Sequence, residues 1–249
     1  MSDQFTNITL DNLEQEHLCC AIADKKHQCG VVTKKQWLKD RIAEGHVFRK
    51  LNAKGKVFIE YAPLETAWVP VVGDDFLYIY CLWVSGAYKG KGYGKALLEY
   101  CINDAKAQGK SGICVLSSKK KKPYLTDKKF MMKFGFEVVD AIGDEYELLC
   151  LSFDGEKPAF TENAKGMCIE QKELTVFYGV QCPYIPDCIG QVKSYCDNND
   201  IPVNLIEIDS LQKAKELPCI FNSWAVFYNG EFVTLQLLNE GQLRKQLDL

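Results

Sequence analysis

The stretch FLYIYCLWVSGAYKGKGYGKALL, residues 76–98, predicts a buried strand that turns through glycine into a helix. Residues 76–84 are aromatic and β-branched on both faces, which is typical of a central strand. Glycine, which allows positive φ and a close approach of the backbone, then follows at alternate positions: Gly90, Gly92 and Gly94. The N–H groups of the loop and of the helix start converge on one point, which predicts an anion site suited to a pyrophosphate. Positive charge comes from Lys89, Lys91 and Lys95.

The spacing of these glycines discriminates between phosphate-binding loops. A dinucleotide fingerprint requires G-x-G-x-x-G and a Walker loop requires G-x-x-x-x-G-K-[ST], and the loop fits neither. Two interpretations remain. One is a tight strand–helix connection without a ligand, and the other is an acetyl-CoA loop, whose pattern is Q/R-x-x-G-x-G/A. Residues 89–94, KGKGYG, fit that last pattern except for Lys89 at its first position. On these residues the chain resembles the GNAT acyltransferases.

The resemblance covers residues 1–153. Strand 76–84 stands where the family's fourth strand stands, and FMMKFGF at 130–136 resembles its segment ending in Gly-Phe. The stretch CLWVSGAYKGKGYG together with KKPYLTDKKF resembles the YoaP-like type in particular. The resemblance implies acetyl-CoA as acyl donor, with its pantetheine bound by backbone N–H groups of Leu82, Trp83 and Val84. It assigns the pyrophosphate to Lys89, Gly90, Lys91, Gly92, Tyr93, Gly94 and Lys95.

Acetyl transfer to an amine requires a base for the ammonium, donors for the tetrahedral oxyanion and an acid for the departing thiolate. The resemblance places the oxyanion donor among the N–H groups of 82–84. It places Met131 where the family carries its acid, a tyrosine, and a thioether cannot donate a proton. Tyr124 is therefore expected to replace it. The base candidates are Tyr78, by alignment, and Glu65, with Asp74 or Asp75 as alternatives. The three carboxylates also fit the simpler interpretation of solvated charges in loops.

A change of composition divides the chain. Residues 154–167 are rich in Gly, Pro, Glu, Lys and Asn, which predicts a linker between a GNAT domain at 1–153 and a second domain at 168–249. In the first domain, helices are expected at 11–23, 34–44, 94–107 and around 126–133. Strands are expected at 46–52, 56–61, 76–84, 112–117, 134–140 and 146–153. This order predicts an α/β fold with a mixed sheet.

The second domain has its own alternation of elements. Strands are expected at 173–179, 201–208, 224–228 and 231–237, and helices at 186–198, 210–217 and 239–247. Asn229-Gly230 between two strands predicts a hairpin. The order β-α-β-α-β-β-α resembles thioredoxin-like folds and implies a smaller α/β domain of that type.

Cysteines raise an alternative function for this domain. Cys182-Pro183-Tyr184 lies where a strand meets a helix, and a helix N-terminus favours the thiolate. A C-x-x-C pair would need a cysteine at 185, which is isoleucine, and Cys188 lies about 9 Å further along an ideal helix. A disulfide would need an irregular first turn. A thiol-disulfide or thiol-binding protein acting through Cys182 and Cys188, with the GNAT domain as a CoA-binding module, is therefore the second hypothesis.

Composition limits which other classes of function the chain can have. The chain has 249 residues, 47% hydrophobic and 25% charged, with a net charge of −3, which argues against nucleic-acid partners. We expect no membrane helix, because no apolar run is long enough, and no signal peptide, because residues 1–10 are polar. We expect a cytoplasmic monomer or homodimer with mostly reduced cysteines, acting on a small-molecule or peptide amine. No metal is expected, because no C-x-x-C pair occurs and His17, His27 and His46 all lie in the first domain.

Overall fold

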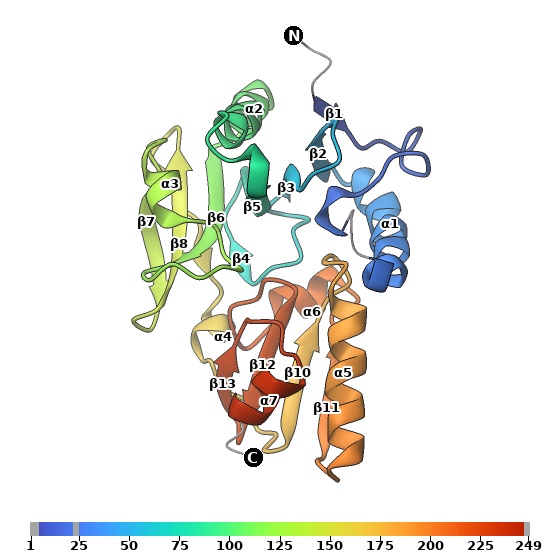
Figure 1. Ribbon diagram of the computed structural model, residues 1–249. Helices are drawn as coiled ribbons and strands as arrows, with labels where there is room; N and C mark the ends of the chain where they lie inside the picture. The colour runs from blue at the N-terminus through green and yellow to red at the C-terminus, as the bar shows by residue number, and fades with distance from the viewer. Residues whose placement is uncertain (1–4, 22–24, 247–249) are drawn as a thin grey trace. The chain divides into compact units, whose positions relative to one another are not determined.

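The computed structural model describes residues 5–21 and 25–246, and the chain divides into two compact units. The first unit contains the described residues of 1–23, 38–67 and 71–160, and the second those of 24–37, 68–70 and 161–249. Each unit has its own sheet (Figure 1). The predicted mixed α/β fold class is confirmed.

The first unit is built on a seven-stranded sheet with the order β1-β2-β3-β5-β6-β8-β7. Among the described strands of this sheet, β5 and β6 run parallel and the other neighbours are antiparallel. The strands are β1 (Phe5–Asn7), β2 (Val47–Leu51), β3 (Val57–Pro63), β5 (Phe76–Val84), β6 (Gly112–Ser118), β7 (Glu137–Ile142) and β8 (Tyr146–Ser152). A short separate pair joins β4 (Val71–Val72) to β9 (Ala159–Phe160).

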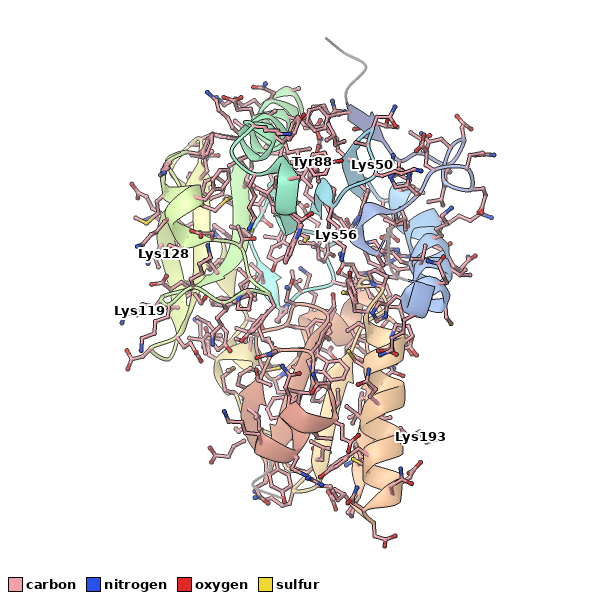
Figure 2. All side chains as sticks on the ribbon, in the orientation of Figure 1. Lys50, Lys56, Tyr88, Lys119, Lys128 and Lys193 are labelled. Carbon is pink, nitrogen blue, oxygen red and sulfur yellow. The ribbon has the colours of Figure 1, made fainter. Side chains whose placement is uncertain are left out.

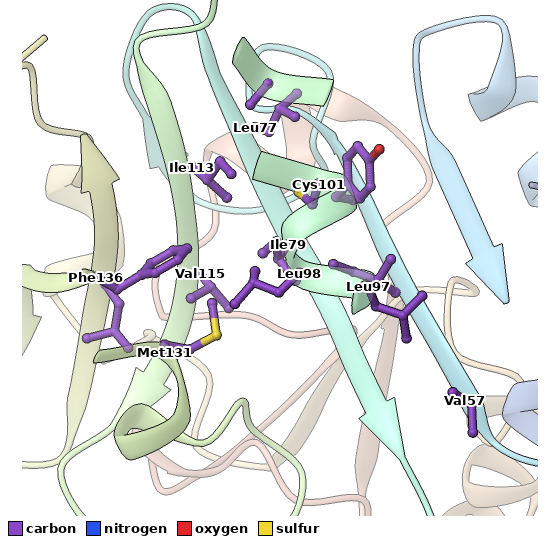
Figure 3. Close-up of a cluster of buried hydrophobic side chains, with 14 of the residues drawn as sticks. Val57, Leu77, Ile79, Leu97, Leu98, Cys101, Ile113, Val115, Met131 and Phe136 are labelled. Atoms are coloured by element: carbon purple, nitrogen blue, oxygen red, sulfur yellow. The ribbon is translucent and has the colours of Figure 1, made fainter. Parts of the chain in front are cut away.

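Helix α2 (Tyr93–Ala107) covers one face of this sheet and packs on β3, β5 and β6. Its apolar stripe at i, i+1, i+4 and i+8 is Leu97, Leu98, Cys101 and Ala105, all fully buried. Figure 3 shows this stripe over the side chains of the sheet. The sheet contributes Val57, Leu77, Ile79, Ile113 and Val115, and α3 (Lys128–Met132) adds Met131. The glycine loop before α2 is thus held at both ends by buried elements.

The helix expected at 11–23 is wrong. Residues 10–16 form hydrogen-bonded turns, and only Cys19–Ala21 is helical, as the 3-10 helix η2; residues 22–24 lie outside the description. The side chain of Asn12 accepts from the N–H of Thr9 and donates to the carbonyl of Asn7. Such side-chain bonds compete with a helical ladder. The second expected helix is longer than predicted, since α1 spans Gln28–Ile42 and follows the 3-10 helix η3 (Lys25–His27).

The second unit contains a four-stranded sheet with the order β11-β10-β12-β13. Its strands are β10 (Leu174–Tyr178), β11 (Val203–Glu207), β12 (Trp224–Tyr228) and β13 (Glu231–Thr234), with β10 and β11 parallel. The helices are α4 (Glu162–Lys165), α5 (Ile185–Asn198), α6 (Leu211–Lys215) and α7 (Glu240–Gln246). The expected hairpin turn at Asn229-Gly230 has φ of 55° and 84°, as a type I′ turn requires. Residues 154–167, expected as a linker, contain β9 and α4.

Candidate functional site

Strands β5 and β6 separate part of the way along their length. Their parallel ladder joins Phe76–Ile79 to Gly112–Val115 and goes no further in the described chain. Strand β5 continues to Val84 on the side of β3, and β6 continues to Ser118 on the side of β8. The two strands therefore diverge in the middle of the sheet, and the backbone of β5 beyond Ile79 has an edge without a strand partner. We call this opening the splay.

A β-bulge marks the apex of the splay. Glu60 of β3 pairs with Cys81, but the next residue, Tyr61, pairs with Ile79. Tyr80 is therefore the extra residue on β5, and a bulge re-aims the side chains and amides that follow it. The predicted pantetheine-binding residues Leu82, Trp83 and Val84 lie directly beyond the bulge. Trp83 is 41% exposed, unusual for a tryptophan on a central strand.

The glycine loop leads from β5 into α2 through the 3-10 helix η4 (Gly86–Tyr88). Gly90 has φ of 75° and Gly92, the N-cap of α2, has φ of 81°, both in the left-handed region. A Cβ atom built on either glycine would meet no atom within 4 Å, so the space in front of the loop is open. No side chain caps α2, and the first N–H groups of a helix have no partner within it. The loop thus presents amides and the positive helix end to one space.

The lysines of the loop are exposed and have different local partners. The ammonium of Lys91 lies 5.8 Å from the centroid of the Tyr88 ring, and that of Lys95 lies 3.6 Å from Glu99 Oε1. Figure 2 shows Tyr88 at the loop. The ring of Tyr88 packs directly against Gly55, so closely that a Cβ atom at residue 55 would overlap it. This contact holds the loop against the turn between β2 and β3. Positive side chains on a fixed loop suit a polyanionic ligand.

Tyr124, the predicted proton donor, lies in the loop after β6, which Lys119 and Lys128 flank (Figure 2). Because β5 and β6 run parallel, this loop and the glycine loop belong to the same end of the sheet. Lys122 lies 5.8 Å from the Tyr124 ring centroid and pairs with Glu145. Partial burial lowers the pKa of Lys122, but hydrogen bonds to Glu145 and Tyr124 outweigh it and raise the pKa overall. A permanent cation therefore lies beside the Tyr124 hydroxyl.

Glu65, a predicted base, lies at the opposite end of β5. Its Oε1 accepts from the N–H of Asp75 at 2.8 Å and lies 3.7 Å from Lys110 Nζ. Asp75 immediately precedes β5 and has φ of 60°, so the Glu65 carboxylate stabilises a strained turn there. The bulge is five residues, or about 16 Å, further along the strand. The structure does not bring Glu65 to the splay.

Tyr78, the other predicted base, is inside the protein. It is 1% exposed and lies below the bulge, with its ring edge against Tyr80. Burial, with the neighbouring Cys114 and Tyr80, raises the pKa of Tyr78 far above its ordinary value. A phenol held protonated in this way does not act as a base near neutral pH. Met131 is fully buried and packs in the core under α2.

One buried pair near the bulge was missed by sequence reasoning. His46 Nε2 lies 3.0 Å from Glu60 Oε1, and the side chains of both residues are almost fully buried. The His46 ring lies 5.3 Å from that of Tyr80. The signal in the sequence was the acid of KVFIEY, the one charged residue inside an apolar strand.

The predicted thiols Cys182 and Cys188 lie in the second unit. Cys182 is half-buried, three residues before α5, and its carbonyl accepts from the N–H of Ile185. Cys188 is 9% exposed on α5, and its N–H donates to Tyr184. The first turn is therefore hydrogen-bonded rather than irregular. Burial, then the charges of Asp187 and Cys182, raise the pKa of Cys188 to about 11. Neither sulfur is in a disulfide.

Two other kinds of feature are absent from the residues that the structure describes. No group of three or more His, Cys, Asp or Glu side chains is arranged to hold a metal ion. No described helix has the length and apolar character to cross a membrane.

Comparisons with known proteins match both parts of the chain. Residues 10–136 match the sequence profile "Acetyltransferase (GNAT) family", and residues 202–245 match the profile "YoaP-like". The uncharacterized N-acetyltransferase YoaP of Bacillus subtilis strain 168 is 39% identical over 246 residues, which is 98% of each chain.

Two solved structures resemble about three fifths of the chain. The PaiA N-acetyltransferase of Thermoplasma acidophilum, in complex with coenzyme A, is 17% identical over 61% of this chain and 100% of that one, with a TM-score of 0.41. The ribosomal-protein-alanine N-acetyltransferase of Brucella melitensis is 14% identical over 60% of this chain and 99% of that one, with a TM-score of 0.44.

Proposed function

The chain belongs to the acetyltransferase (GNAT) family, and from this premise we propose that it transfers an acetyl group from acetyl-CoA to an amine by direct attack on the thioester. The family and its YoaP-like branch, inferred above from residues 81–94, are confirmed, and with them an N-acetyltransferase at the level of the family. The donor, the site residues and the acceptor are the proposal.

The observation that carries the proposal is the glycine loop next to a splayed, bulged strand. Acetyl-CoA is a linear molecule with a pyrophosphate near one end and a thioester at the other. The open space before Gly90 and Gly92, at the uncapped start of α2, suits the pyrophosphate. The unpaired edge of Leu82–Val84 offers amides along which pantetheine can lie as an added strand. The thioester then points toward the bulge at Tyr80.

The chemistry requires charge stabilisation at that point. An N–H beyond the bulge is not used by the β5–β6 ladder and can donate to the tetrahedral oxyanion. Tyr124 follows the diverging strand β6, and we propose that its hydroxyl protonates the leaving thiolate. The ammonium of Lys122 lies beside the Tyr124 ring, 5.8 Å from its centroid. Protonation by solvent would then return Tyr124 to its starting state.

Glu65 and Tyr78 were predicted as bases, and neither is favoured by its surroundings. Glu65 holds the turn before β5, and Tyr78 is a buried phenol. Both remain testable, because Glu65→Gln and Tyr78→Phe would each slow transfer strongly if the residue took the proton of the amine.

The experiment that tests the proposal has two parts. Titration calorimetry with acetyl-CoA and with CoA measures donor binding. A panel of amines, containing amino acids, polyamines, aminoglycosides and lysine peptides, is then incubated with acetyl-CoA, and mass spectrometry identifies the acetylated product. Binding with turnover of at least one amine supports the proposal. A protein that binds no acyl-CoA, or that binds it and acetylates nothing, is not the enzyme proposed.

We further propose that residues 168–249 form a thioredoxin-like domain joined by the linker at 154–167 to the GNAT domain at 1–153. The support is the order of elements, β10-α5-β11-α6-β12-β13-α7, which is the order β-α-β-α-β-β-α of the resemblance. In this proposal the domain shapes or recruits the acceptor. The thiol hypothesis gains nothing from the hydrogen-bonded turn at Cys182 or from the raised pKa of Cys188. We also propose a cytoplasmic protein without a metal.

A further inference from the structure

We propose that His46 is the base that takes the proton from the attacking amine, and that Glu60 is the positioning residue that orients its imidazole. This inference rests on the proposed acetyl transfer and supplies the proton acceptor that Glu65 and Tyr78 do not. It starts from a buried pair with His46 Nε2 3.0 Å from Glu60 Oε1, which joins the residue directly before β2 to β3 across 14 residues of sequence.

The register of the sheet places Glu60 at the apex of the splay. Glu60 lies directly opposite Cys81, and opposite residues of an antiparallel pair point to the same face. That face is the one away from α2, because the alternate residues Ile59 and Tyr61 belong to the core under α2. Cys81 is the residue after the bulge and is half-buried. The carboxylate is therefore one strand away from the edge where the thioester is proposed to lie.

The imidazole lies beside the side chain of the bulge residue. Its ring lies 5.3 Å from that of Tyr80, the first residue beyond the last β5–β6 pair. His46 is also fixed through its backbone, because its N–H donates to the carbonyl of Arg41. A histidine held by a carboxylate on one nitrogen has its tautomer and orientation set for proton transfer at the other. The arrangement is that of a base with its orienting group.

Burial explains why a histidine suits this place. A buried carboxylate retains its charge only with a partner. In the proposed tautomer the Nε2–H of neutral His46 donates to Glu60 before the transfer, and the imidazolium that the transfer forms pairs with it. The ammonium form of the acceptor gives one proton to His46, and the nitrogen lone pair then forms the C–N bond to the thioester carbonyl. The C–S bond breaks and the thiolate takes a proton from Tyr124 and leaves as CoA. The second amine proton is lost to solvent, which reprotonates Tyr124. His46 returns its proton to solvent.

Other ionisable groups surround the pair and must be considered in any pH profile. Those on the elements around it are Lys50 of β2, Arg41 of α1, Cys20 of η2, and Tyr78, Tyr80 and Cys81 of β5. Lys50 provides a matched control, because it is also fully buried in an ion pair on the same face, 2.8 Å from Glu16.

The test compares His46→Gln, Glu60→Gln and Lys50→Met with the wild type. The readouts are the affinity for acetyl-CoA, kcat and KM for the amine of the panel that turns over fastest, the pH profile of kcat, and the melting temperature. For H46Q we expect kcat to fall about 100-fold or more, with unchanged acetyl-CoA affinity and loss of the acidic limb of the profile. For E60Q we expect about a tenfold fall and an acidic limb moved to lower pH, because the carboxylate no longer stabilises the imidazolium. For K50M we expect the acidic limb of the pH profile to stay at the same pH as in the wild type.

The outcomes separate this inference from the function on which it rests. If the wild-type protein shows no acetyl-CoA binding or no turnover, both the proposed function and the base assignment are wrong. A wild-type enzyme that is active, with H46Q within threefold of its kcat and an unmoved acidic limb, removes the base assignment alone. Lower melting temperatures in all three variants, with pH profiles like the wild type, would assign the pair to structure and likewise overturn the inference.

Discussion

Ile79 of β5 and Val115 of β6 form the last backbone pair that these two parallel strands share. Both side chains are buried under α2, so the point where the strands part is fixed by the core (Figure 3). Everything proposed for catalysis follows from that point: the bulge at Tyr80, the unpaired edge of β5 and the two loops beyond the strand ends.

Gly92 is expected to contribute to donor binding as well as to stability. The change is Gly92→Ala, with Gly109→Ala as its matched control, since both glycines have positive φ, 81° and 67°, with open space around the missing Cβ. An L-residue in this conformation costs about 1–2 kcal/mol, so both variants lose similar unfolding free energy. Only G92A places a methyl group in the predicted pyrophosphate site, and we expect calorimetry to show at least tenfold weaker acetyl-CoA binding. Equal affinities in the two variants would argue against this site.

Tyr124→Phe is expected to slow the chemical step. If the hydroxyl protonates the thiolate, its removal lowers kcat about 100-fold, while KM for acetyl-CoA changes little. Steady-state kinetics with free-thiol detection measures both constants. Tyr228→Phe, which alters a half-buried tyrosine of the second unit, serves as control and keeps the wild-type kcat. A kcat for Y124F equal to that of Y228F would leave thiolate protonation to solvent.

The strand and loop at residues 76–98 could be predicted because local pattern and tertiary structure agree there. Strand β5 has the predicted bounds, Phe76–Val84, and α2 starts one residue before its predicted start. The left-handed conformation of the loop glycines could be predicted in the same way, because positive φ is a local property. The His46–Glu60 pair could not be predicted, because it joins the residue before β2 to β3 and depends on the register of these strands, in which Phe48 is opposite Glu60. Likewise, only the tertiary structure shows that the Glu65 carboxylate accepts a hydrogen bond from the N–H of Asp75.

Glu65 is expected to act on stability rather than on catalysis. Glu65→Ala removes the acceptor for the N–H of Asp75 and is expected to lower the unfolding free energy by about 1–2 kcal/mol. Glu65→Gln keeps an acceptor oxygen and is expected to retain kcat within about threefold, where loss of a general base would cost about 100-fold or more. Urea unfolding and kinetics on both variants check this. A large kcat loss in E65Q with unchanged stability would restore the carboxylate as base.

Tyr61 is expected to make the fold sensitive to alkali. Its hydroxyl donates to Asp104 Oδ2 at 2.6 Å, and burial, then the nearby Cys101 and Asp104, raise its pKa well above the ordinary value of 10.0. The folded chain therefore keeps a proton that the unfolded chain loses above pH 10, so stability is present below that pH and declines above it. Tyr61→Phe is expected to reduce this slope by about 1.4 kcal/mol per pH unit. Denaturant titrations between pH 8 and 11 measure it, and parallel profiles for wild type and Y61F would contradict the assignment.

Cys188 is expected to be an unreactive thiol near neutral pH. With a pKa raised to about 11 by burial, then Asp187 and Cys182, only about 10⁻⁴ of it is thiolate at pH 7. Iodoacetamide labelling followed by peptide mass spectrometry should modify the exposed Cys29 long before Cys188. The electrostatic causes can be separated by two opposed changes. Asp187→Asn removes a negative charge and speeds labelling of Cys188, whereas Lys26→Met removes a cation that lowers its pKa and slows it. Rapid labelling of Cys188 at pH 7, together with loss of transfer in Cys182→Ser, would instead favour the thiol hypothesis for the second unit.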